Sequence, residues 1–145
     1  MNSQLVTLIK LDTVHLYVDT IKKILTFDVL SSSYSKNDSR IVLEYFKNFW
    51  LLAKEQNVKY YMIIKINEIG IYPLNFYSTL ISYLTELNYI FTDYLHSCCF
   101  LCASNNPINM LKPLFSVYTL SRPFSVFTTY EDILNYFNKS ENNIK

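Results

Sequence analysis

Residues 58–66 form an almost continuous apolar run, and this run constrains the fold more than any other part of the chain. The run is rich in β-branched side chains, which favour strands. A strand without polar alternation is typical of a sheet that is buried on both faces, as in α/β proteins. The pattern around this run therefore decides the fold class.

Strand-like runs and amphipathic segments alternate along the chain. The other strand-like runs cover residues 4–11, 14–18, 24–30, 96–103 and 125–127. Segments whose apolar residues are spaced by three and four, as in helices, cover residues 39–56, 73 to about 87 or 91, 106–118 and 128–138. This order predicts one α/β domain over residues 1–139, with a mixed β-sheet and about four helices, and a polar tail at 140–145.

Several residues are expected to end these elements. Asn37 or Asp38 is predicted to cap the helix at 39–56, and Asn57 to end it. Thr128, followed three residues later by Glu131, predicts a capping box for the last helix.

Gly70 is the only glycine among the 145 residues. Turns that need a positive φ are therefore expected to use Asn or Asp, and a glycine-rich phosphate-binding loop is excluded. The heavy use of Asn, Ile, Lys, Tyr and Phe, whose codons are AT-rich, suggests an AT-rich source genome such as that of a large DNA virus, a protist or a low-GC bacterium.

The charge and the termini narrow the possible partners. The net charge is +1, from 13 basic and 12 acidic side chains, so the chain lacks the basic surplus of a nucleic-acid-binding domain. No apolar stretch approaches the roughly 20 residues of a membrane-spanning helix, and the start of the chain lacks the pattern of a secretory signal. Reduced cysteines, odd in number, fit a cytoplasmic location, in a host cell or a virion if the protein is viral.

The residue types that most often carry catalysis or bind metals are poorly placed. His15 and His96 lie far apart and have no carboxylate beside them at metal-binding spacing, so we expect structural or solvent-facing roles. Cys98, Cys99 and Cys102 lie inside one apolar strand, where alternate side chains point to opposite faces. We therefore expect core cysteines, and neither a metal nor a cofactor.

Carboxylates are the remaining catalytic candidates. Asp12, Asp19 and Asp28 mark the strand-rich start of the chain, and Glu68 follows the strand at 58–66. Ligands of α/β sheets bind at the carboxyl ends of strands, which makes Glu68 the acid of most interest. No Lys, Arg or His is placed by the sequence to complete a reactive set, so a solvated loop carboxylate is the expected role.

The order of elements after residue 58 resembles the STAS domain, the fold of the bacterial anti-sigma-factor antagonists. The resemblance rests on an apolar strand (residues 61–66) that closes on Asn67-Glu68-Ile69, and on a helix start that follows directly. It also rests on a strand that ends in Ala103-Ser104-Asn105-Asn106-Pro107, and on a final proline-led strand and amphipathic helix (residues 121–137).

The resemblance implies a non-enzymatic interaction module, with one departure from the family. Phosphorylated members open the second helix with Asp-Ser-Ser-Gly, whereas this chain has Pro73-Leu74-Asn75-Phe76, so a phosphoserine switch is not expected. The residues that the resemblance offers to a partner are Asn67, Glu68, Ile71, Tyr72, Asn75, Ser78 and Thr79.

Three functions remain open from the sequence. The preferred one is a STAS-like module that binds another protein or a second copy of itself, and the loop tyrosines Tyr34, Tyr72, Tyr94 and Tyr118 favour it, since exposed Tyr is enriched at interfaces. The alternative is a domain that binds an apolar small molecule or lipid, because the chain is half hydrophobic. The third is an enzyme that uses Glu68 with a histidine.

Overall fold

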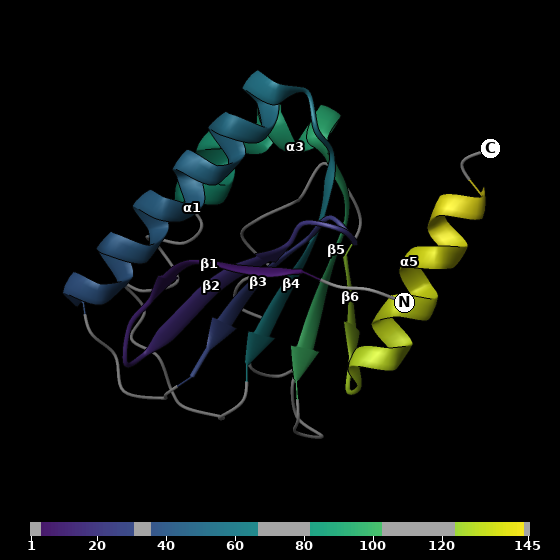
Figure 1. Ribbon diagram of the computed structural model, residues 1–145, viewed down its shortest axis with the longest axis horizontal. Helices are drawn as coiled ribbons and strands as arrows, with labels where there is room; N and C mark the ends of the chain where they lie inside the picture. The colour runs from purple at the N-terminus through teal and green to yellow at the C-terminus, as the bar shows by residue number, and fades with distance from the viewer. Residues whose placement is uncertain (1–3, 31–35, 67–81, 103–123, 144–145) are drawn as a thin grey trace.

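The computed structural model describes residues 4–30, 36–66, 82–102 and 124–143, and these form an α/β fold around a six-stranded mixed sheet (Figure 1). The strands are β1 (Leu5–Lys10), β2 (Val14–Asp19), β3 (Ile24–Val29), β4 (Tyr60–Ile66), β5 (Leu95–Cys102) and β6 (Phe124–Phe127). They lie in the sheet in the order of the sequence. The pairs β1–β2 and β2–β3 are antiparallel, and the pairs from β3 to β6 are parallel. The predicted fold class is confirmed.

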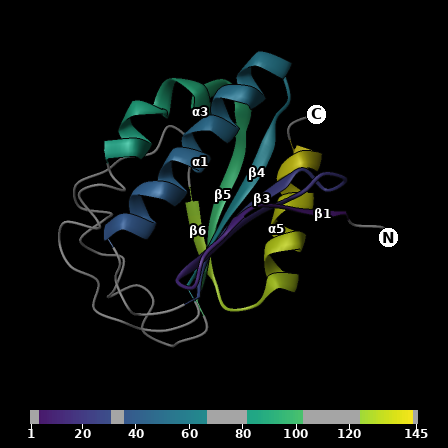
Figure 2. The ribbon, with the colours of Figure 1, turned by 60° about the vertical axis from the view of Figure 1, so that its left-hand side comes forward.

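Helices cover both faces of this sheet. The helix α1 (Lys36–Gln56) and the helix α3 (Asn88–Tyr94), which follows a helical turn at residues 82–86, lie on one face. The helix α5 (Tyr130–Asn143) lies on the other face (Figure 2).

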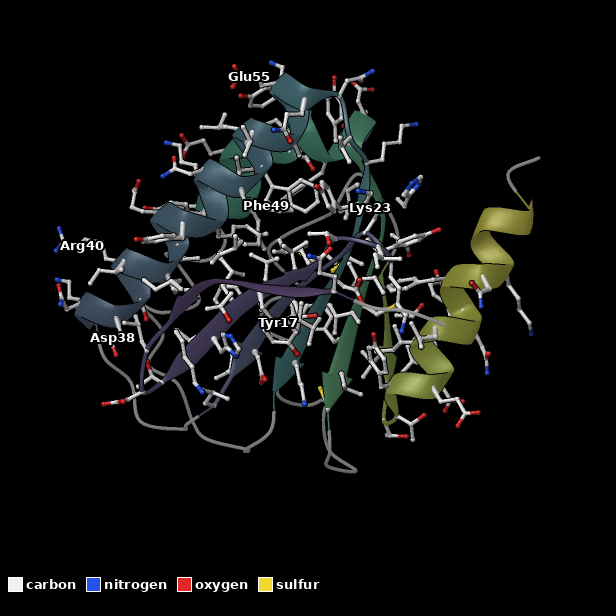
Figure 3. The ribbon with its side chains drawn as sticks, in the orientation of Figure 1. Tyr17, Lys23, Asp38, Arg40, Phe49 and Glu55 are labelled. Carbon is white, nitrogen blue, oxygen red and sulfur yellow. The ribbon has the colours of Figure 1, made fainter. Side chains whose placement is uncertain are left out.

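The larger core lies between the sheet and the two helices α1 and α3. On β2, Val14, Leu16 and Val18 face this core, as the period of two in a strand requires. Trp50 of α1 is fully buried, and its ring meets Phe91 of α3 edge to face with 5.1 Å between centroids. Phe49 points from α1 toward the sheet, whereas Arg40 and Glu55, near the two ends of α1, point away (Figure 3).

The smaller core lies under α5. It consists of buried residues from three strands and one helix: Ile24, Tyr61, Ile63, Cys99, Leu101, Ile133 and Phe137. The ring of Tyr61 stacks on Phe137 with 4.3 Å between centroids. Residues 61–64 of β4 are all buried, so this strand is covered on both faces as its apolar run predicted.

The start of α1 differs from the prediction, and its end agrees with it. The helix begins at Lys36, so Asn37 and Asp38 lie inside its first turn and the predicted cap is wrong. A carboxylate is favourable there because of the helix dipole, and Asp38 Oδ2 also accepts a 3.0 Å hydrogen bond from Thr13 Oγ1. At the other end Asn57 has a φ of 57°, and the N–H of Val58 donates to the carbonyl of Ala53, the pattern of a Schellman cap.

The last helix begins later and ends later than predicted. Its cap is Thr129, whose Oγ1 accepts a hydrogen bond from the N–H of Asp132 at 3.2 Å, so the predicted capping box of Thr128 and Glu131 is wrong by one residue. The strand before it ends at Phe127, which leaves two residues to turn into the helix. The helix extends to Asn143 rather than to residue 138.

The predicted second helix is described only in its last part. Helix continues to Tyr94 with a turn at Leu87, and the chain then passes directly into β5 because Leu95 is extended (φ −103°, ψ 115°). Residues 73–81 and the helix predicted at 106–118 lie outside the described residues.

Replacing Phe46 by Ala should lower the free energy of unfolding by about 3–5 kcal/mol, because it removes a fully buried ring and leaves a cavity. Phe46 is 1% exposed and lies between Phe27 and Trp50. The control is Tyr45→Ala, one residue away on the same helix, where the side chain is 45% exposed and the change should stay within about 0.5 kcal/mol. Urea denaturation of both variants measures the difference; equal losses would contradict this description of the core.

Candidate functional site

The face of the sheet that carries α5 is only partly covered by the described helices. α5 packs on β4, β5 and β6 and shares its core with Ile24 at the start of β3, and it leaves β1 and β2 beside it (Figure 2). The sheet twists strongly, so that β1 runs across the view in Figure 1 while β4 to β6 point downward. This twist brings the turn between β2 and β3 toward the start of α5, where Lys22 Nζ lies 5.9 Å from the ring centroid of Tyr130.

A pocket of about 330 Å³ lies between that turn and α5. We call it the hairpin–helix crevice. Residues from β1 to β5, from the β2–β3 turn and from the start of α5 line it: Leu5, Tyr17, Asp19, Lys22, Ile24, Thr26, Ile63, Lys65, Leu101 and Tyr130. Tyr17, which is labelled in Figure 3, comes from β2, the second strand of the sheet.

Asp19 lines the crevice, and its carboxylate accepts hydrogen bonds from the backbone. Its Oδ1 accepts hydrogen bonds from the N–H groups of Ile21 and Lys22 at 3.0 Å each, and from that of Gln4 at 3.4 Å. The side chain is 3% exposed. Asp19 therefore fixes the turn that carries Lys22 and joins it to the first residue of the described chain.

The same turn contains Lys23 at a φ of 60°. The expectation that positive φ values fall on Asn or Asp is confirmed at Asn57 and wrong at Lys23. The carboxylate of Asp19 and the bond from the N–H of Tyr61 to the carbonyl of Lys23 hold the turn in this conformation. Lys23 Nζ also lies 5.9 Å from the ring of Tyr60.

Charged groups meet on the sheet next to the crevice. Asp28 of β3 pairs in register with His15 of β2 on one side and with Lys65 of β4 on the other. His15 Nε2 is 2.9 Å from Thr7 Oγ1. Burial and the charge of Lys10 lower the pKa of His15, against the opposite effect of Asp28.

The two tyrosines of the crevice are hydrogen-bond donors at neutral pH. Burial, followed by the charge of Asp28, raises the pKa of Tyr17 above its usual value, and a hydrogen bond with Thr26 partly opposes this. Burial, followed by the charge of Asp19, raises the pKa of Tyr130. Both phenols therefore keep their protons and can donate to an acceptor.

The two lysines of the crevice are its remaining charges. In the part of the chain that the structure describes, neither Lys22 nor Lys65 forms an ion pair. The ion pair between Lys47 Nζ and Glu86 Oε1, 2.8 Å apart, lies on the opposite side of the sheet. The crevice thus combines two ammonium groups and two hydroxyls with an apolar floor of Ile24, Ile63 and Leu101.

The residues predicted for partner binding lie outside the described residues. These are Asn67, Glu68, Ile71, Tyr72, Asn75, Ser78 and Thr79. Of the predicted histidines, His15 is half-buried beside the crevice and His96 stacks on Tyr61 at 4.7 Å. The structure does not bring these two together, since one lies on β2 and the other on β5.

The cysteines are buried, as predicted. Cys98 and Cys102 face the larger core and Cys99 the smaller one, so the Cys99-x-x-Cys102 pair points to opposite faces of β5. Burial raises the pKa of Cys99 to about 12 and also raises those of Cys98 and Cys102. A thiol is a poor nucleophile and metal ligand in this state, because the thiolate is the reactive form.

The described residues contain neither a cluster of metal ligands nor a membrane-spanning helix. Among residues 4–30, 36–66, 82–102 and 124–143, no group of three or more His, Cys, Asp and Glu side chains could hold a metal ion. Over the same ranges no helix combines the length and the apolar character that crossing a membrane requires.

Sequence reasoning missed the crevice although part of its signal was present. In β2 the polar residues His15 and Asp19 alternate with Val14, Leu16 and Val18, which places them on one face. The alternation could have shown that this face is partly polar. It could not have shown that Lys65 and Tyr130, distant in sequence, belong to the same site.

Comparison of the chain with protein-family models, with curated proteins and with solved structures gives no match. The STAS resemblance is therefore neither supported nor opposed by a relative, and it stays a prediction from the sequence.

Replacing Asp19 by Ala should destabilise the fold by about 1–3 kcal/mol, because backbone N–H groups of the turn lose their acceptor. Asp19→Asn keeps an oxygen acceptor and should cost less. The control is Asp12→Ala, which changes an exposed acid in the turn between β1 and β2 and should alter stability by less than about 0.5 kcal/mol. If urea denaturation shows the same stability for Asp19→Ala and Asp12→Ala, Asp19 does not organise the turn.

His15 should titrate below the ordinary histidine pKa of 6.5, as followed by NMR of its ring protons. Lys10→Gln should raise this pKa, because it removes a repulsive charge, and Lys59→Gln should leave it unchanged. Since the folded pKa is lower than the unfolded one, the unfolded chain binds more protons below pH 6.5, and the contribution of His15 to stability falls as the pH drops through that window. An unshifted pKa in the wild type, or no response to Lys10→Gln, would contradict the assignment.

Proposed function

We propose that this chain is a non-enzymatic protein-interaction module and that it binds its partner through the open edge of β1. The observation that carries the proposal is an edge strand with exposed apolar side chains. Among the strands that the structure describes, β1 is the first of the sheet and pairs with β2 alone. A strand from another protein, or from a second copy of this chain, can extend the sheet there by main-chain hydrogen bonds.

The register of β1 identifies the backbone groups that such a strand would use. The N–H of Thr20 donates to the carbonyl of Gln4 at 2.9 Å, and the pairing continues through Val6 opposite Val18. In an antiparallel ladder, hydrogen-bonded and non-hydrogen-bonded pairs alternate. The N–H and C=O groups of Leu5 and Thr7 therefore point away from β2, toward the open edge.

The side chains around this edge are apolar and exposed. Leu5 is 65% exposed and Val6 40%, and Ile21 of the neighbouring turn is 54% exposed. Natural edge strands are usually protected by proline, charges or bulges. Within β1 itself these features are Lys10 at its end and one irregularity between Thr7 and Ile9. Residues 4–7 contain none of them, and no described strand covers this edge.

Several sequence predictions agree with this function and stay predictions. They are the STAS resemblance, the binding residues between Asn67 and Thr79, the cytoplasmic location and the viral or AT-rich source. The β1 edge is independent of them, since it lies in the N-terminal strands and was not among the predicted binding residues.

A second candidate function is the binding of a small molecule, and the hairpin–helix crevice favours it. Small-molecule sites are typically concave, mostly apolar and equipped with a few polar groups that orient the ligand. The crevice has this composition, at the lower end of the usual volume range.

The substitution Thr7→Pro tests the edge. It removes the outward N–H of residue 7 and should abolish strand addition, whereas an edge position tolerates proline within the sheet. The control is Thr7→Val, which also loses the hydroxyl contact with His15 but keeps the N–H. Light scattering coupled to gel filtration should show a dimer for the wild type and Thr7→Val and a monomer for Thr7→Pro, if the partner is a second copy.

For a different partner protein, the wild type and Thr7→Val should capture it from the native source and Thr7→Pro should not. Amide hydrogen exchange gives the direct readout, because the amides of Leu5 and Thr7 should become protected only in the complex. Partner binding that is equal in Thr7→Pro, or complex formation without protection of these two amides, would exclude the β1 edge.

A further inference from the structure

We propose that the hairpin–helix crevice binds a small amphiphilic anion, that is, an organic molecule with one carboxylate or phosphate group on a short apolar body. The inference rests on the second candidate function. Leu5 borders both the crevice and the β1 edge, whereas Thr7, the residue that tests the edge, does not line the crevice.

The positively charged side chains that line the crevice favour an anionic ligand. Lys22 and Lys65 supply two ammonium groups, and Asp19 is the one carboxylate among the described residues that line the crevice. Its Oδ1 accepts hydrogen bonds from three backbone N–H groups, which compensate part of its negative charge. Tyr17 and Tyr130 add two hydroxyl donors, and a carboxylate or phosphate accepts hydrogen bonds from both kinds of group.

The lysine positions are fixed by the fold. Lys65 lies on β4 between two paired strands. Lys22 follows the Asp19 turn, and its Nζ is near the ring of Tyr130 at the start of α5. A ligand that contacts Lys22 and Lys65 would therefore bridge the β2–β3 turn and the centre of the sheet.

The apolar residues at the base of the crevice favour a ligand with an apolar part. Ile24, Ile63 and Leu101 come from three adjacent strands of the same sheet face. They belong to one packed cluster and have exposed fractions from 1% to 9%, so the base of the crevice is apolar and rigid, and only a small part of each side chain faces it. Burying a methylene group on such a surface contributes roughly 0.8 kcal/mol. Inorganic phosphate alone would leave this contribution unused.

Asp28 opposes anion binding and provides an internal check. It lies beside Lys65 in register and does not line the crevice. Its charge reduces the positive potential at Lys65, so Asp28→Asn should strengthen the binding of an anion and weaken that of a cation. A purely apolar pocket would not respond in this way.

The test is a titration of the full chain, followed by ¹H–¹⁵N NMR, with hexanoate and with hexyl phosphate. The controls are hexan-1-ol, hexylammonium and inorganic phosphate. We expect saturable shifts of amides around Thr26, Lys65 and Leu101 with one or both amphiphilic anions, and the two probes distinguish a carboxylate ligand from a phosphate ligand. Lys22→Gln and Lys65→Gln should each weaken binding about tenfold, the equivalent of about 1.4 kcal/mol, and Lys59→Gln, on the exposed side before β4, should not.

Three results would overturn the inference. One is binding of hexan-1-ol or hexylammonium as tight as that of the anions. Another is unchanged affinity in both lysine variants when their spectra show a folded chain. The last is the absence of saturable shifts with both anions at the millimolar concentrations where even weak ligands bind. Because Thr7→Pro should keep anion binding, this test and that of the β1 edge can fail separately.

Discussion

Burial of β4 and β5 on both faces is the constraint on which the rest of the structure depends. Parallel strands in the centre of a sheet expose no polar face, so apolar layers must cover both sides. α1 and α3 supply one layer through Phe46, Trp50 and Phe91, and α5 supplies the other through Ile133 and Phe137. The strand β3 is also buried on both faces. The strand β2 buries Val14, Leu16 and Val18 on one face and leaves His15 and Tyr17 half-buried on the face that carries α5.

Both candidate sites follow from the unequal covering of the two faces of the sheet. Where the second layer stops, the twisted hairpin and the start of α5 enclose the crevice. At the edge of the described sheet, no other described strand pairs with the outward backbone groups of β1 next to Leu5 and Val6. The buried cysteines take no part in either site, because the layers that cover β5 raise their pKa and keep the thiols protonated.

The sequence predicted the elements better than the sites, for physical reasons. Period and apolar runs report local burial, so the strands and the end of α1 at Asn57 were predictable. The first residues of helices were less predictable, because several polar residues near Asp38 and near Thr129 could cap the helix. Tertiary contacts, such as the hydrogen bond from Thr13 to Asp38, decide between them. The crevice depends on register: the pairing of Asp28 with both His15 and Lys65, and the approach of Tyr130, follow from the assembled sheet. The positive φ of Lys23 was unpredictable because Asp19 stabilises a turn that the residue itself does not favour.

The strand order has a consequence for how the chain folds during synthesis. Each strand pairs with the strand that precedes it in the sequence, so the sheet runs from β1 to β6 without a later strand inserted between earlier ones. Each described strand after β1 therefore meets a partner that has already been made, and the sheet can grow from one edge in the direction of translation. Among the described strands, the newest one always forms the growing edge of the sheet, and β1 stays at the opposite edge.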